Sequence, residues 1–86
     1  MKYRVKIKAK AEDVIRVADR LDDEIEDFHK GSVLVRTRAD LGIVSAEIMK
    51  DYAHIGYAMN DAALISGLMM GNDCHINSVI ITFNKG

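Results

Sequence analysis

The sequence contains one cysteine, Cys74, and neither proline nor tryptophan. A single cysteine excludes a disulfide within the chain and is typical of a reducing compartment, so we expect a cytoplasmic location. The stretch 62–72 is uncharged but far shorter than the roughly 20 residues that cross a bilayer. The first ten residues carry charge at alternate positions, unlike the apolar segment of a signal peptide. We therefore expect neither a membrane anchor nor an export signal.

The chain has 86 residues, of which 49% are hydrophobic and 29% charged, with a formal net charge of -1. These values are ordinary for a folded globular domain and exclude a disordered chain. We expect one compact domain over residues 1–86. A domain of this size has a thin core, which a second copy of the chain would help to complete.

The first forty residues show two different hydrophobic periods. Residues 2–10 alternate between apolar and basic side chains, which predicts a half-buried strand. Apolar residues then recur at steps of four and three, which predicts a helix over 11–29 that stops at Lys30 and Gly31. Residues 32–39 alternate again and form the second predicted strand. A strand, a long helix and a strand predict a right-handed βαβ unit with parallel strands.

The segment 43–70 is predicted to be the apolar central helix of the domain. Its apolar positions recur at alternating steps of four and three, with a second stripe of smaller side chains beside them. A break near Asn60-Asp61 is one alternative. A strand over 63–70, paired as a hairpin with the C-terminal segment, is another, but its composition favours helix by about two to one. Residues 79–83 form the last predicted strand.

These elements predict an α/β, or α+β, two-layer sandwich: a βαβ unit, a long or broken helix and a C-terminal strand. The order is compatible with a ferredoxin-like architecture, which many unrelated functions share. It differs from that architecture in one respect, because residues 41–44 are too few to supply a further strand.

Charge is segregated along the predicted elements. The outward faces of the first two strands carry mainly Lys and Arg, whereas the helix over 11–29 carries most of the acids. The candidate partner-binding residues on this basic sheet face are Arg4, Lys6, Lys8, Arg36 and Arg38. Such a face suits an acidic protein surface or a phosphate backbone, although it lacks aromatic side chains to stack on bases. The alternative is that the lysines only protect an edge strand from aggregation.

The broad apolar arc of the central helix offers a surface for self-association. The candidate oligomer interface consists of Ile48, Tyr52, Ile55 and Met59. The alternative is that the sheet and first helix of the same chain cover this arc. A head-to-tail contact between the acidic helix of one copy and the basic sheet of another is a further route to oligomers.

Signals for catalysis are weak. Glu47, Asp51 and His54 fall at steps of four and three, so one helix face would hold a metal or an acid–base site. The alternative is a solvated polar face. Asp73, Cys74 and His75 are more typical of a turn, and no phosphate-binding loop or nucleophile motif is present. We therefore expect no cofactor and no small-molecule substrate.

The expected function is that of a small non-enzymatic binding protein, which docks on a protein partner or on a second copy of itself. Proteins of this size often serve as inhibitors or adaptors, including those of phages and mobile elements. The first alternative is a nucleic-acid-binding module that uses the basic sheet face. The second is a small oligomeric enzyme or metal site at Glu47, Asp51 and His54.

Overall fold

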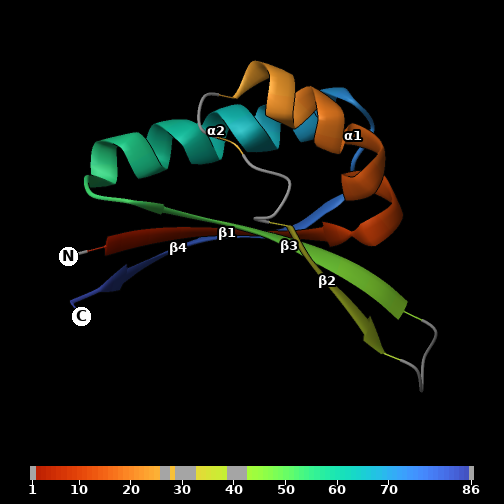
Figure 1. Cartoon of the computed structure of the whole chain (residues 1–86), viewed down its shortest axis with the longest axis horizontal. Coiled ribbons are helices and arrows are strands. Elements are labelled where there is room, and N and C mark those ends of the chain that lie inside the picture. Colours follow the sequence, from red (N-terminus) through yellow and green to blue (C-terminus); the bar gives the residue numbers. More distant parts are fainter. Residues whose placement is uncertain (1, 26–27, 29–32, 39–42, 86) are drawn as a thin grey trace.

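The computed structural model describes residues 2–25, 28, 33–38 and 43–85, and within these ranges the side chains of 33–38, 43 and 44 are not described. These described residues form four strands and two helices (Figure 1). In chain order they are β1 (Lys2–Lys10), α1 (Ala11–Glu24), β2 (Val33–Arg38), β3 (Ile43–Tyr52), α2 (Ile55–Gly71) and β4 (Ile76–Asn84).

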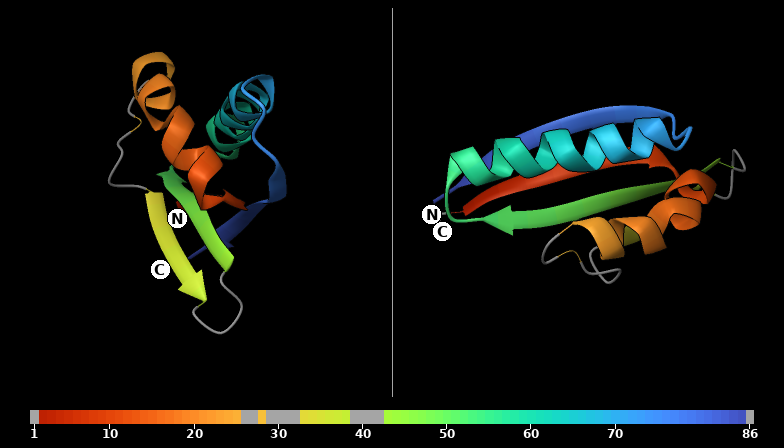
Figure 2. Two further views of the ribbon diagram at one scale, coloured as in Figure 1. Left: turned by 90° about the vertical axis from the view of Figure 1, so that its right-hand side faces the viewer. Right: turned by 90° about the horizontal axis from the view of Figure 1, so that it is seen from above.

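The four strands form one sheet in the order β2-β3-β1-β4, and every neighbouring pair is antiparallel. Both helices lie on the same face of this sheet, as Figures 1 and 2 show. The predicted two-layer sandwich is therefore confirmed. The order β-α-β-β-α-β, with β3 between β1 and β2, is compatible with a split βαβ, ferredoxin-like arrangement. No described element covers the other face of the sheet, which we call the open face.

The predicted parallel pairing of the first two strands is wrong. β1 pairs with β3 on one side and with β4 on the other, so β3 separates β1 from β2. The crossover through α1 returns the chain parallel to β1, but it leaves room for one strand between them. That strand is β3, which joins β2 as an antiparallel hairpin partner.

The first ten residues of the predicted central helix are instead strand β3. Ile48 and Tyr52 are four residues apart, and this spacing puts two side chains on one side of a helix and also on one face of a strand. In the structure Ala46 and Ile48 are buried beneath the helices. Glu47 and Asp51 lie opposite Lys8 and Arg4 of β1, on the open face.

Helix α1 begins where the sequence predicts but ends at Glu24, five residues before the predicted end. Its first turn carries Glu12 and Asp13, where the helix dipole favours anions. No basic residue lies in its last turn. The acids at the end of α1 oppose the dipole there, which favours the early stop. The predicted stop at Lys30 and Gly31 lies outside the described residues.

Helix α2 runs without a break past Asn60 and Asp61, so the predicted interruption is wrong. The helical reading of 63–70 is confirmed over the strand alternative. The helix ends at Gly71, and Asp73 takes a left-handed conformation with a φ of 62° in the turn that follows. This turn sends the chain into β4 beside β1.

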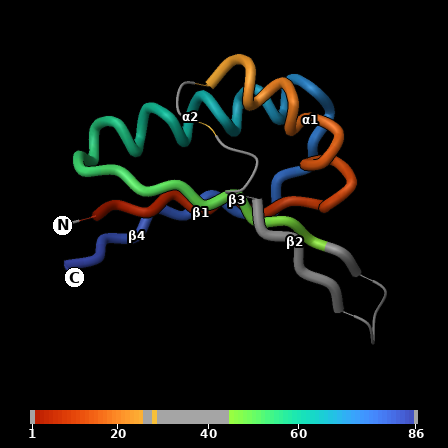
Figure 3. The backbone as a smooth tube through the Cα atoms, viewed as in Figure 1, coloured from red at the N-terminus to blue at the C-terminus, as the bar shows by residue number. Residues whose placement is uncertain are grey.

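The core lies between the sheet and the two helices. Its fully buried side chains come from β1, β3, α1 and α2, and the largest are Val5, Ile7, Val14, Leu21, Ile48, Ile65 and Met69. In Figure 3 the two helices lie on the same side of the sheet. Within the described ranges, neither helix combines the length and apolarity required to cross a membrane.

Candidate docking surface

Among the described strands, β4 pairs with β1 alone, so it is an edge of the sheet. Seen from above in Figure 2, it runs along the outer border of the molecule, and α2 lies on its inner side. Its nine residues, INSVIITFN, include no charged side chain and no proline. Edge strands usually carry such residues because unpaired N–H and C=O groups otherwise bind other strands. β4 therefore lacks the residues that usually block pairing at the edge of a sheet.

Apolar side chains of β4 are exposed on both of its faces. Val79 and Phe83 project toward the helix layer and are 44% and 47% exposed. Ile80 lies opposite Lys6, on the open face, and is 49% exposed. Phe83 stacks partly on Tyr3 of β1, with the ring centroids 5.0 Å apart. This stacking holds the ring at the edge of the sheet.

Helix α2 adds an exposed apolar stripe to the same side of the molecule. Ile55, Met59 and Met70 lie on one flank of the helix and are 43% to 60% exposed. Asp61 lies on the opposite flank, where it reaches β3. The stripe therefore faces the β4 side. We call Ile55, Met59, Met70, Val79, Ile80 and Phe83 together the β4–α2 edge.

The four residues of the predicted oligomer interface differ in how far the structure exposes them. Ile48 is fully buried in the core, so it is inaccessible to another molecule. Tyr52 is partly buried and donates its hydroxyl to Asp61 Oδ2 over 2.7 Å. Ile55 and Met59 lie on the exposed stripe of α2. The prediction failed for Ile48 because it placed β3 on a helix.

Asp61 connects α2 to the sheet. Its carboxylate accepts hydrogen bonds from Lys50 Nζ over 3.1 Å and from the Tyr52 hydroxyl. The Lys50 ammonium also lies 5.2 Å from the centre of the Tyr52 ring. Burial, together with the hydrogen bond to Asp61, raises the pKa of Tyr52 well above its ordinary value of 10.0. This cluster fixes the position of α2 over the sheet and thereby positions the exposed stripe.

On the described part of the open face, carboxylates of β3 lie beside two of the predicted partner-binding cations of β1. Arg4 binds Asp51 through two hydrogen bonds of 2.8 and 3.2 Å, and the bond with Arg4 lowers the pKa of Asp51. Lys8 lies directly opposite Glu47 of β3. The first two strands are not adjacent, because β3 lies between them and brings carboxylates next to β1. The side chains of Arg36 and Arg38 lie outside the described part of the chain.

A shallow hollow of about 230 Å³ lies on the open face at the end where β1 begins and β4 ends. The residues that line it are Lys2, Arg4, Lys6, Asp51, Thr82, Phe83 and Asn84. Asp51 is already bound to Arg4 inside this hollow. The hollow is therefore a mixed polar surface, in which one carboxylate lies among three cations.

The predicted site at Glu47, Asp51 and His54 loses its geometric basis. Glu47 and Asp51 belong to a strand, where side chains four residues apart are separated by about 13 Å. His54 precedes α2, and its ring packs against Tyr57 with centroids 5.8 Å apart. Among the described residues, no three His, Cys, Asp or Glu side chains are placed to share a metal ion.

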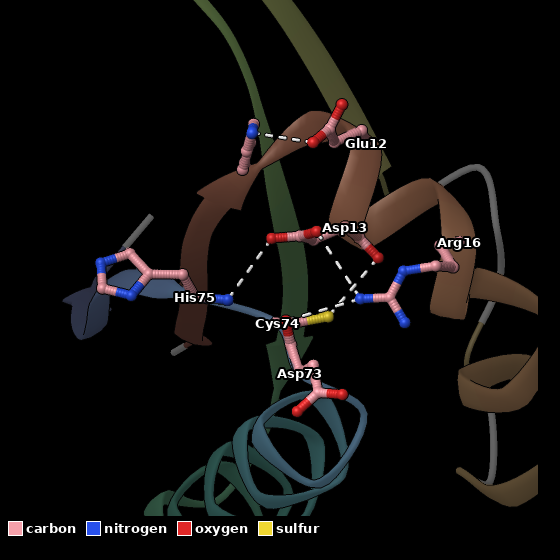
Figure 4. Close-up of polar contacts among 7 residues, drawn as sticks. Glu12, Asp13, Arg16, Asp73, Cys74 and His75 are labelled. Carbon is pink, nitrogen blue, oxygen red and sulfur yellow. Dashed lines mark hydrogen bonds and ion pairs between the residues drawn. The ribbon is translucent and has the colours of Figure 1, made fainter.

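Asp73, Cys74 and His75 form the turn that the sequence predicts, and it docks on the start of α1 (Figure 4). The backbone N–H of His75 donates to Asp13 Oδ2 over 3.5 Å. The Cys74 thiol lies 3.4 Å from the Asp13 carbonyl oxygen, and burial raises the pKa of this thiol. Arg16 bridges the Asp13 carboxylate and the Asp73 carbonyl. These contacts anchor the beginning of β4.

The exposed residues of β4 were not among the predicted site residues. Their signal in the sequence is the uncharged run 76–84, which indicates a docking strand only once β4 is known to lie at an edge of the sheet.

Comparisons of the chain with protein-family models, with curated proteins and with solved structures find no match.

Proposed function

We propose that this chain is a small non-enzymatic protein-binding domain that docks through the β4–α2 edge. The observation that carries the proposal is an uncharged edge strand of nine residues flanked by exposed apolar side chains. Its occupant is an extended, uncharged strand of another polypeptide, which pairs with β4 through backbone hydrogen bonds and covers the apolar side chains. The single cysteine supports a cytoplasmic setting for this function.

The size of the exposed surface supports this proposal. The six side chains of the β4–α2 edge together expose on the order of 500 Å², most of it on the helix side and the part from Ile80 on the open face. This area lies within the range of the largest apolar patch on an ordinary monomer, and such patches are often functional. The other sheet edge, β2, has two arginines among its six residues, the kind of charge that blocks edge pairing.

Nucleic-acid binding through the open face is the alternative that the test below distinguishes from docking at β4. Carboxylates lie among the cations of the open face, where they would repel a phosphate backbone. An adaptor or inhibitor would use the same docking surface. Which of these roles the chain has depends on the protein that it binds.

The test is selection of nine-residue peptides displayed on phage against the folded chain. We expect selected peptides to be uncharged, rich in β-branched residues and dependent on Val79, so that Val79→Lys abolishes their binding. Lys8→Glu, on the open face, is the matched control and should leave binding unchanged. Selection of acidic peptides that lose binding in Lys8→Glu, or binding of a nucleic-acid oligomer in its place, would overturn the proposal.

A further inference from the structure

We infer that the strand bound at the β4–α2 edge is β4 of a second copy, which pairs antiparallel across a two-fold axis at Ile81. The inference rests on the proposed function and specifies its partner. The two sheets would join into one sheet of eight strands, with all four helices on the same face. Such a contact uses the same patch on both copies and closes as a dimer.

The register follows from the regular part of β4. Ser78–Asn84 pairs with β1 without interruption, and the ladder shifts between the partners of Lys8 and Ala9. The midpoint of this regular stretch is Ile81. With Ile81 opposite its own copy, Val79 of one chain faces Phe83 of the other, twice by symmetry. The two exposed apolar side chains on the helix side of β4 therefore cover each other.

Charge favours the antiparallel arrangement over the parallel one. The nearest charged residues on either side of β4 are Asp73, before the strand, and Lys85, after it. Antiparallel pairing brings Lys85 of one copy toward the end of the partner that holds Asp73. Parallel pairing would place each charge beside its own copy. The strands themselves are uncharged, so no like charges face each other along the ladder.

The exposed apolar side chains account for more than half of the area that a stable dimer needs. A standard interface buries about 800 Å² per partner. The apolar side chains of the β4–α2 edge supply on the order of 500 Å², and the polar side chains and backbone along β4 would have to supply the rest. The stripe of α2 is part of this surface, since Ile55, Met59 and Met70 project toward the β4 side.

The first measurement is the mass of the full chain in solution by sedimentation equilibrium, from about 1 µM to about 1 mM. We expect twice the chain mass of 9.6 kDa. Val79→Lys and Phe83→Lys should each raise the dimer dissociation constant roughly tenfold or more, because each buries an ammonium at the interface. Lys8→Glu is the control on the open face. A monomer throughout, or a mass that grows beyond the dimer, overturns the inference.

The second measurement tests the register without a destabilising charge. Val79→Cys and Phe83→Cys chains, mixed and mildly oxidised, should form a linked heterodimer, because directly opposed residues lie within disulfide reach. Either variant alone should link poorly, since its two copies of the new thiol lie about 13 Å apart along the strands. Cys74 is buried and serves as the internal control. A dimer in which the mixture fails to link overturns the register.

The two proposals fail in different ways. A monomeric chain that still selects uncharged peptides at β4 retains the docking function and loses the two-fold partner. A monomeric chain that selects no such peptide loses both.

Discussion

Asp61 is the residue at which the helix layer and the sheet are joined by charge. Its carboxylate receives the Lys50 ammonium and the Tyr52 hydroxyl, and the ion-paired side chains of Lys50 and Asp61 are only 13% and 21% exposed. Hydrogen bonds to a charged group in such partly buried places stabilise a fold more than those at the surface. The Arg4–Asp51 pair has comparable distances but is much more exposed. We therefore expect the Lys50–Asp61 pair to contribute more to the stability of the fold than the Arg4–Asp51 pair.

We expect Asp61→Ala to lower the free energy of unfolding by about 1–3 kcal/mol, because two partly buried donors lose their shared acceptor. Asp51→Ala is the matched control and should have a much smaller effect, since its pair is solvated. Urea denaturation of both variants measures the difference. Equal losses of stability would contradict the ranking by burial.

The raised pKa of Tyr52 predicts that the folded chain loses stability at alkaline pH. Its pKa in the folded chain is raised above the ordinary value of 10.0, chiefly by burial and then by Asp61. The unfolded chain therefore loses this proton first as pH rises. The stabilising contribution is complete below pH 10 and declines as pH rises toward the folded-state pKa. Urea denaturation at increasing pH should show this decline in the native chain and a smaller one in Tyr52→Phe, whose phenyl ring cannot ionise.

At the scale of elements, strand β3 shows where sequence periodicity stops being informative. A step of four residues fits one side of a helix and one face of a strand, so Ile48 and Tyr52 agree with both structures. The strict alternation of β1 has no such ambiguity, and its bounds were predicted correctly. The helical steps in α1 also predicted two of its core positions, Val14 and Leu21, whereas the buried Val17 lies outside the predicted stripe. Regular patterns of a single period are therefore the dependable ones.

The candidate site was less predictable than the fold, because it depends on which strand lies at the edge. Strand order arises from contacts between distant segments, and local periodicity does not contain it. Ile55 and Met59 were recognised as surface candidates from the breadth of the apolar arc. Val79 and Phe83 were read only as strand residues, since exposure of β4 follows from the sheet order. The basic face was predicted without β3 for the same reason. In the structure, Glu47 and Asp51 of β3 lie opposite Lys8 and Arg4 of β1 on that face.

Helix α2 contains a position that lowers its stability without a packing reason. Gly67 lies in the interior of the helix, and a Cβ built there would meet no atom within 4 Å. We expect Gly67→Ala to raise the free energy of unfolding by about 0.5–1 kcal/mol, because alanine loses less backbone entropy on folding. Gly71→Ala, at the last residue of the helix, should give a smaller gain. Thermal or urea denaturation measures both, and destabilisation by Gly67→Ala would contradict the open space around it.

At the scale of the whole molecule, the distribution of charge and apolar surface is compatible with two kinds of self-association. The acidic side chains of α1 and the cations of β1 lie on opposite layers, which would allow head-to-tail stacking of copies. The uncharged β4 instead allows edge-to-edge pairing. Head-to-tail contacts do not close unless the rotation forms a ring, whereas two-fold pairing at an edge closes at two copies. The two modes therefore differ in both stoichiometry and electrostatics.

The effect of salt on the dissociation constant distinguishes these two modes of self-association. Raising NaCl from about 0.1 M to about 1 M shortens the Debye length from roughly 10 Å to roughly 3 Å, which weakens contacts between exposed charges. Pairing through β4 depends on backbone hydrogen bonds and apolar burial, so we expect the dimer dissociation constant to change little or to fall. Sedimentation equilibrium at both salt concentrations measures it. Dissociation at high salt, accompanied by a loss of association in Lys8→Glu, would show that the layers attract each other and that the edge of β4 is not the contact.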